Sequence, residues 1–143
     1  MSMLIASLMF VALLAVSFAH FLWSLGRSWP IRDEKLLAQT VVGFEGIERM
    51  PPRLASFAVA LATLAAALIA AALADHDSGG AGLILLGIPL AAVFLARGIV
   101  GYTPWFIAKT PHPNFRLNDR RVYSPLCLAL GVGFIVLVVL RLL

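Results

Sequence analysis

Residues 54–74 read LASFAVALATLAAALIAAALA, a run of apolar and small side chains that contains no charge. A helix rises about 1.5 Å per residue, so roughly 20 such residues cross the hydrocarbon core of a membrane. Three further stretches meet this requirement, at residues 3–25, 82–102 and 123–140. The sequence therefore predicts an all-α membrane protein in which a single domain, residues 1–143, forms a bundle of four transmembrane helices.

The composition excludes a water-soluble domain. Hydrophobic residues make up 62% of the chain, only 13% of residues are charged, and the mean hydropathy is +0.98. Soluble domains carry about 25% charged residues, and a chain of this length has too little interior to hide the excess apolar surface. The net charge of +4 comes from side chains between the apolar runs rather than along one soluble face. We therefore interpret it as an orientation signal and expect no nucleic-acid partner.

The lysines and arginines predict which way the bundle faces. They concentrate in two connections, at residues 26–53 between the first two spans and at residues 103–122 between the last two. With an even number of spans these two long loops lie on the same side, and the positive-inside rule favours the cytoplasm for them. Both termini are then expected outside.

Small residues predict how the spans pack. In the second span alanine recurs at every fourth position, which predicts a ridge that lets another helix approach closely. We therefore expect the second span to be a central packing helix and the fourth, rich in valine and leucine, to face mainly lipid. Ser124 and Pro125 resemble an N-cap followed by a first-turn proline, so the fourth span is expected to begin there. The residues of the ridge are Ala58, Ala62, Ala66, Ala70 and Ala74.

Polar side chains near the cytoplasmic ends of the spans are the best site candidates. His20 and Trp23 share one face of the first span, and ionisable residues at membrane depth usually face the bundle interior or a wet cavity. Arg97 in the third span needs a counter-charge, and Asp119 is the expected partner in a structural ion pair. If Arg97 instead faces a pocket, its charge suits a carboxylate or phosphate. The candidate pocket residues are His20, Trp23, Arg97, Tyr102 and Tyr123.

No recognised cofactor or catalytic motif occurs. The outward sequence Asp75-His76-Asp77 offers three potential metal ligands, but adjacent side chains diverge, so we interpret it as a solvated turn rather than a metal site. The chain has no glycine-rich phosphate loop, HExxH, CxxC or GxSxG pattern. We expect no cofactor.

The chain resembles DUF3995, a family of small bacterial membrane proteins of unknown function. The resemblance rests on Ala19-His20 with Trp23 and Gly26, the loop from Val42-Gly43 to Pro51-Pro52, Arg97, and Asp119 leading to the element Tyr-Ser-Pro-Leu-Cys-Leu at residues 123–128. It implies a bacterial inner-membrane setting and a four-helix fold. It implies no activity.

Three functional hypotheses follow. The first is a protein that binds or transports a lipid-like or amphipathic small molecule in a cytoplasm-facing pocket. The second is an accessory or scaffolding subunit that docks onto a larger membrane complex or a copy of itself. The third, with the weakest support, is a membrane enzyme that uses His20 as a base, because no catalytic constellation accompanies this histidine.

Overall fold

The computed structural model describes residues 1–77 and 79–143, and within these residues the chain is helical without a strand. Four helices are long and apolar enough to cross a membrane by length and composition. Their ends lie within two residues of those that the sequence predicts, except at the start of the fourth, where continuous helix begins at Pro113. They are α1 (Ser2–Ser24), α3 (Arg53–Ala74), α4 (Gly80–Val100) and α7 (Ser124–Leu142).

Shorter helices fill the two long connections. The first connection contains α2 (Glu34–Val41), whose N-terminus is capped by the Asp33 carboxylate through the Leu36 N–H. The second contains α5 (Pro104–Lys109) and α6 (Pro113–Asn118), each with proline in its first turn. A π-helical turn, η1 (Asp119–Tyr123), then leads directly into α7.

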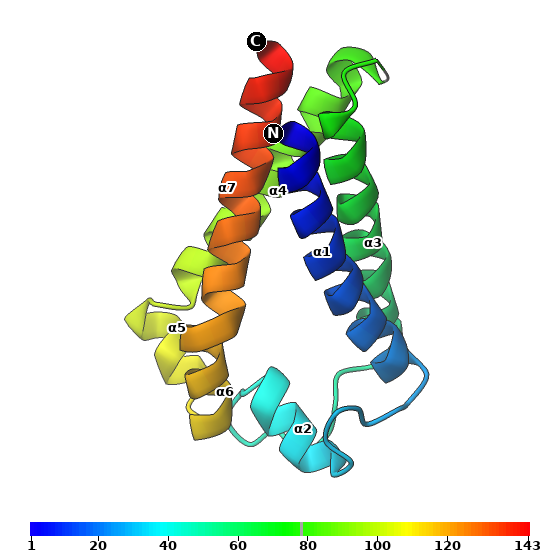
Figure 1. The fold of residues 1–143 in the computed structure, drawn as a ribbon. Helices are drawn as coiled ribbons and strands as arrows, with labels where there is room; N and C mark the ends of the chain where they lie inside the picture. The colour runs from blue at the N-terminus through cyan, green and yellow to red at the C-terminus, as the bar shows by residue number, and fades with distance from the viewer. Residues whose placement is uncertain (78) are drawn as a thin grey trace.

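The long helices form two antiparallel pairs. Helix α1 packs mainly on α3, and α4 packs mainly on α7; we call these pairs the first arm and the second arm. Figure 1 shows that the arms meet at the end that holds both termini and the α3–α4 turn, and that they separate toward the other end. Helix α2 lies across this open end, which we call the loop end.

Small residues allow the arms to approach where they meet. A Cβ atom on Gly133 of α7 would lie 2.5 Å from Met9 Sδ of α1, and one on Gly87 of α4 would lie 3.0 Å from Leu73 Cδ1 of α3. Phe134 is fully buried beside these contacts and stacks on Phe94. The core of the molecule therefore lies at the terminal end, where glycine permits close packing.

Helix α7 is a packing helix, so the expectation that the fourth span mainly faces lipid is wrong. It contacts α1, α3 and α4, and its buried residues recur on one face. Valine and leucine are equally suited to lipid and to helix packing, so their abundance does not distinguish the two. The informative residues were the glycines: a Cβ on Gly131 would lie 2.9 Å from the backbone nitrogen of Leu95.

The alanine ridge of α3 is only partly buried. Ala66, Ala70 and Ala74 are in the core, whereas Ala58 and Ala62 are exposed. Four residues turn a helix by about 400°, so a ridge with this spacing drifts by about 40° at each step and leaves the packed face. Helix α3 is a packing helix as predicted, but along its length the buried face follows other residues, such as Ser56 and Ala60.

Candidate functional site

The clearest polar cluster surrounds Asp119, the first residue of η1. Its side chain has no exposed surface, and it accepts from Arg97 Nη2 at 2.8 Å through Oδ1 and from Arg116 Nη1 at 3.3 Å through Oδ2. A buried carboxylate is costly unless charged donors compensate for its lost hydration. Arg97 and Arg116 supply that compensation, so Asp119 holds the end of α4 against α6 and η1.

Further hydrogen bonds connect the cluster to the surrounding backbone. Arg116 donates to the Gly101 carbonyl at 2.9 Å and to Thr110 Oγ1 at 3.3 Å. Arg97 Nη1 donates to Ser124 Oγ at 3.4 Å, and its guanidinium carbon lies 5.1 Å from the centre of the Phe106 ring. The cluster therefore fastens the whole second connection to the loop end of the second arm.

Gly101 makes this arrangement sterically possible. A Cβ atom at this position would collide with Ser124 Oγ and would lie 2.7 Å from Asp119 Oδ2. The backbone after α4 therefore approaches the buried carboxylate more closely than any other residue would allow.

The start of the fourth long helix differs from the expectation. Ser124 has helical dihedral angles and donates its backbone N–H to the Asp119 carbonyl, five residues earlier, so it is not an N-cap. Helix continues from Pro113 through Leu142. Proline cannot complete the usual i→i−4 bond, and a π-helical turn before Pro125 accommodates this gap. The same turn places Asp119 and Ser124 together against Gly101.

Tyr123 and Tyr102 have different positions. Tyr123 packs on Phe115 with ring centres 5.9 Å apart, and its hydroxyl donates to the Thr40 carbonyl of the first connection at 3.4 Å. A Cβ on Gly43, whose φ is +74°, would overlap the Phe115 ring. Tyr123 thus belongs to the contact that docks α2 onto α6. Tyr102 is 46% exposed at the surface, and within the described residues its side chain makes no hydrogen bond or ring contact with the Asp119 cluster.

His20 and Trp23 lie on the first arm, near the loop end of α1. Their rings are 4.7 Å apart in an edge-to-face arrangement. His20 Nδ1 is 2.9 Å from the Val16 carbonyl, an acceptor, so Nδ1 carries the proton in this contact. Trp23 Nε1 donates to the Trp29 carbonyl at 2.7 Å.

The position of His20 around α1 directs it toward the second arm. Met9 contacts Gly133 of α7, and His20 follows Met9 by 11 residues, close to three full turns of helix. Arg97 similarly lies one heptad after Leu90, which packs against the core between the arms. His20 and Arg97 therefore lie on the faces of α1 and α4 that are turned toward the other arm, at the level where the two arms have separated.

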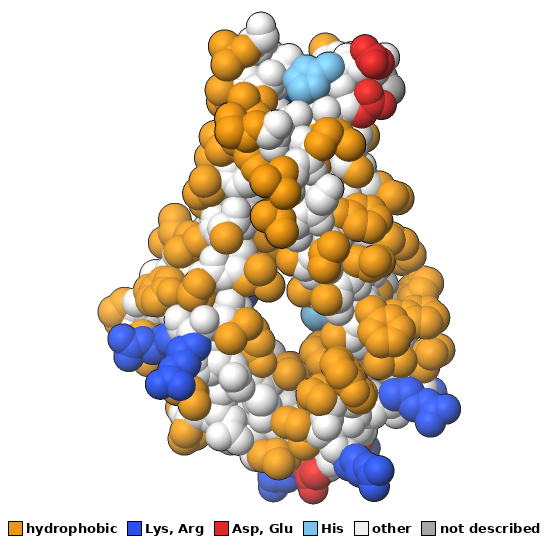
Figure 2. Space-filling model, viewed as in Figure 1, with side chains coloured by type: hydrophobic (Ala, Val, Ile, Leu, Met, Phe, Trp, Pro, Cys, Tyr) orange, Lys and Arg blue, Asp and Glu red, His pale blue; other side chains and the backbone are white. Residues whose placement is uncertain are grey.

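Figure 2 shows that an opening passes through the molecule between the arms, above α2. The expected pocket residues thus form two groups rather than one contact cluster. His20 and Trp23 belong to the first arm. Arg97 belongs to the second arm, where it pairs with Asp119 of η1, the turn that also contains Tyr123. No contact joins the two groups within the described residues.

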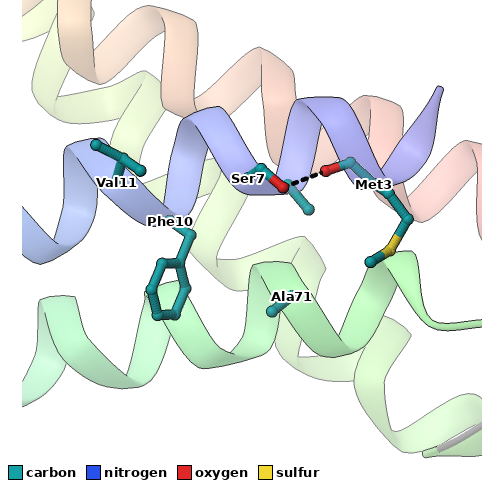
Figure 3. Close-up of a pocket in the computed structure, with 6 residues that line it drawn as sticks. Met3, Ser7, Phe10, Val11 and Ala71 are labelled. Atoms are coloured by element: carbon teal, nitrogen blue, oxygen red, sulfur yellow. Dashed lines mark hydrogen bonds between the residues drawn. The ribbon is translucent and has the colours of Figure 1, made fainter.

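Two other hollows lie on the first arm and contain none of the expected site residues. One, of about 320 Å³, is formed by Met3, Ser7, Phe10, Val11 and Ala71, which Figure 3 shows between α1 and α3. The other, of about 260 Å³, lies nearer the loop end and includes Phe21, Phe57 and Leu61. Both are almost entirely apolar, so neither offers the groups that catalysis requires.

Sequence reasoning missed Arg116, Thr110, Ser124 and Gly101 as members of the cluster. The spacing of Arg116 and Asp119, three residues apart on one helical face, was the available signal. No sequence pattern indicated the approach of Gly101.

No group of three or more His, Cys, Asp or Glu side chains that could hold a metal forms in the part of the chain that the structure describes. At the α3–α4 turn, His76 Nδ1 lies 3.1 Å from the Ala74 carbonyl and Nε2 lies 3.3 Å from the Leu140 carbonyl. His76 therefore contacts the ends of α3 and α7.

Comparison with known proteins gives a family and no function. The model of DUF3995, described as a protein of unknown function, matches residues 13–134. No curated protein and no solved structure matches the chain.

Proposed function

The chain belongs to the DUF3995 family, and we propose that it binds an amphipathic organic anion in the opening between its two arms. Arg97 binds the anionic head group, and His20 with Trp23 lies on the opposite wall. The observation that carries the proposal is the charge of the Asp119 cluster, in which two guanidinium groups share one carboxylate.

The surplus positive charge lies on the most accessible member of the cluster. The Asp119 side chain is 0% exposed, that of Arg116 is 15% exposed, and that of Arg97 is 35% exposed. Two of the five N–H donors of the Arg97 guanidinium are used within the protein, which leaves donors for a ligand. A guanidinium binds carboxylate and phosphate groups through paired, charge-assisted hydrogen bonds.

The opposite wall offers a complementary acceptor and an aromatic surface. With Nδ1 donating to Val16, neutral His20 has its lone pair on Nε2, which has no hydrogen-bond partner in the described part of the chain. A hydroxyl or a protonated phosphate suits this atom. Among the described residues, His20 contacts no carboxylate that would orient it as a base, so binding is better supported than the enzyme alternative.

The proposed membrane placement puts the opening at head-group depth. The four long helices cross the inner membrane of a bacterium, with the loop end in the cytoplasm and both termini outside. Figure 2 supports this orientation, because the Lys and Arg side chains visible on this face gather toward the loop end. An anion held above α2 then extends its tail sideways from the opening into the inner leaflet.

An accessory role in a larger complex or a homo-oligomer is the alternative. This alternative does not account for the surplus positive charge of the Asp119 cluster, whereas anion binding does.

The test is a binding titration of the full-length protein in mild non-ionic detergent. Dodecyl phosphate is the anionic probe and dodecylphosphocholine the zwitterionic one. We expect saturable binding of dodecyl phosphate to one site, weakened about tenfold or more by Arg97→Gln, because a lost charge-assisted bond costs about 1.5–3 kcal/mol. Arg97→Gln removes the surplus charge but keeps the Arg116–Asp119 pair, so the buried carboxylate retains a counter-charge.

The matched control is Arg121→Gln, which removes the same charge from an exposed position on the same connection. It is expected to bind dodecyl phosphate like the native protein. Equal weakening by both variants would show that only general positive charge matters. Equal binding of both probes would also refute the proposal.

A further inference from the structure

The hollow of about 260 Å³ on the first arm has features of a lipid site. Its walls come from both helices, and its floor is the contact at which Ser17 Oγ donates to the Ala60 carbonyl at 2.7 Å. We call it the α1/α3 groove. We propose that it holds an acyl chain of an anionic phospholipid whose phosphate is bound by Arg53 and Arg27.

The groove opens on the face of the first arm that is turned away from the second arm. Leu14, Phe18 and Phe21 of α1 line it, whereas Met9 of the same helix contacts α7. At 100° per residue, these lining positions lie roughly 120–180° around the helix from Met9. The groove is therefore separate from the opening between the arms.

The chemistry of the groove suits hydrocarbon. Apart from Ser17, every side chain that lines it is apolar, and the hydroxyl of Ser17 is already bonded to Ala60. Phe18, Phe21 and Phe57 keep 40% or more of their surface exposed along its walls. A polar ligand would find no partner here, whereas an acyl chain gains apolar and dispersion contacts.

Two arginines lie at the loop end of the groove. Arg53 precedes the wall residue Phe57 by four residues, one turn along the same face of α3. Its guanidinium lies against Gly26, because a Cβ there would be 2.7 Å from Arg53 Nη2. Arg27 is the next residue after Gly26. Both arginines are exposed, and neither takes part in a salt bridge within residues 1–77 and 79–143.

The charge arrangement favours a phospholipid over a second copy of the chain. In a two-fold contact through this face, both copies would bring Arg53 and Arg27 to the same depth, where like charges repel. The phosphate of a phospholipid whose acyl chain lies in the groove would instead place a negative charge beside these two arginines. The inference does not depend on the proposed function, because it uses another arm and other residues.

The experiment measures lipid binding to the full-length protein by native mass spectrometry in mild detergent. The probes are phosphatidylglycerol and phosphatidylcholine with the same acyl chains. We expect phosphatidylglycerol to bind about tenfold or more tightly, with Arg27→Gln/Arg53→Gln removing this preference. The matched control, Arg120→Gln/Arg121→Gln, makes the same charge change in η1 of the second connection and is expected to keep the preference for phosphatidylglycerol.

A second pair of variants tests the acyl chain. Leu61→Trp enlarges an exposed wall residue and should weaken binding of phosphatidylglycerol, whereas Val93→Trp places the same side chain on exposed α4 surface and should not. Equal binding of the two lipids by the native protein overturns the proposal, as does equal loss in the two charge-removing double variants. Equal effects of the two tryptophan substitutions also overturn it. Arg97→Gln should leave the lipid preference intact, which separates this result from the test of the proposed function.

Discussion

Arg97 and Asp119 are 22 residues apart in the chain, yet Arg97 Nη2 and Asp119 Oδ1 lie 2.8 Å from each other and connect the end of α4 to η1. The carboxylate is fully buried and is shared with Arg116. This relationship has two consequences. Asp119 is essential for the packing of α4 against η1 at the loop end of the second arm. Because one carboxylate neutralises only one of the two guanidinium groups, Arg97 can also bind an anion.

Replacement of Asp119 by asparagine should destabilise the protein strongly. Two guanidinium groups would then share a partly buried site without a counter-charge, and breaking a buried ion pair costs about 3–5 kcal/mol. The measurement is thermal unfolding in detergent. Glu48→Gln is the control, because Glu48 and Lys35 form a surface pair with side chains 72% and 55% exposed. Such pairs contribute less than about 1 kcal/mol. Similar losses in the two variants would contradict the central role of Asp119.

Replacement of Gly101 by alanine should also destabilise the protein, by about 1–3 kcal/mol or more, because the new methyl group overlaps Ser124 and crowds Asp119. Gly82→Ala is the matched control in α4. A Cβ at Gly82 meets no atom of the described residues within 4 Å, so this variant should unfold at an unchanged or slightly higher temperature. Equal unfolding temperatures of the two alanine variants would contradict the close approach of Gly101 to Ser124 and Asp119.

Alanine variants of Gly43 and Gly46 distinguish the effect of losing the α2–Phe115 contact from the effect of backbone strain. Both glycines have positive φ, +74° and +71°, so alanine is strained at either position. Only at Gly43 would the Cβ also overlap Phe115, whereas at Gly46 it meets nothing within 4 Å. Gly43→Ala should therefore release α2 and speed amide hydrogen exchange in residues 34–41 beyond the change in Gly46→Ala. Equal exchange in the two variants would argue against the α2–Phe115 contact.

The proposed orientation predicts which loops react with reagents outside the cell. In a Cys127→Ser background, which removes the single native cysteine, Asp77→Cys should react with a membrane-impermeant maleimide in intact cells. Glu45→Cys in the first connection should react only after the cells are opened. Both positions are exposed in the structure. The reverse pattern would place the loop end outside.

The sequence predicted the four long helices well, because a long apolar segment in lipid must satisfy its own backbone hydrogen bonds, and a helix does so. It predicted the central role of α3 but not that of α7, since valine and leucine suit both lipid and helix contacts. The start of the last long helix was misplaced because Ser124 and Pro125 imitate a helix start. The π-helical turn before Pro125 begins at Asp119 and continues the helix without a break, which no sequence pattern indicated.

The candidate site was predictable only in part. The need of Arg97 for a counter-charge follows from its place in an apolar span, and Asp119 was the expected partner. The contributions of Gly101 and Thr110 depend on how the backbone after α4 turns back on α7. The separation of His20 from Arg97 across the opening depends on the angle between the arms, and helical periodicity gives the face of each residue but not that angle.

The most direct test of anion binding between the arms is photo-crosslinking with an alkyl phosphate that carries a diazirine beside its head group, followed by peptide mapping. We expect adducts on both arms, in α1 near His20 and in α4 near Arg97, and a marked loss of both in Arg97→Gln but not in Arg121→Gln. Adducts confined to the outward face of α1 and α3, or equal labelling in the two variants, would contradict the account.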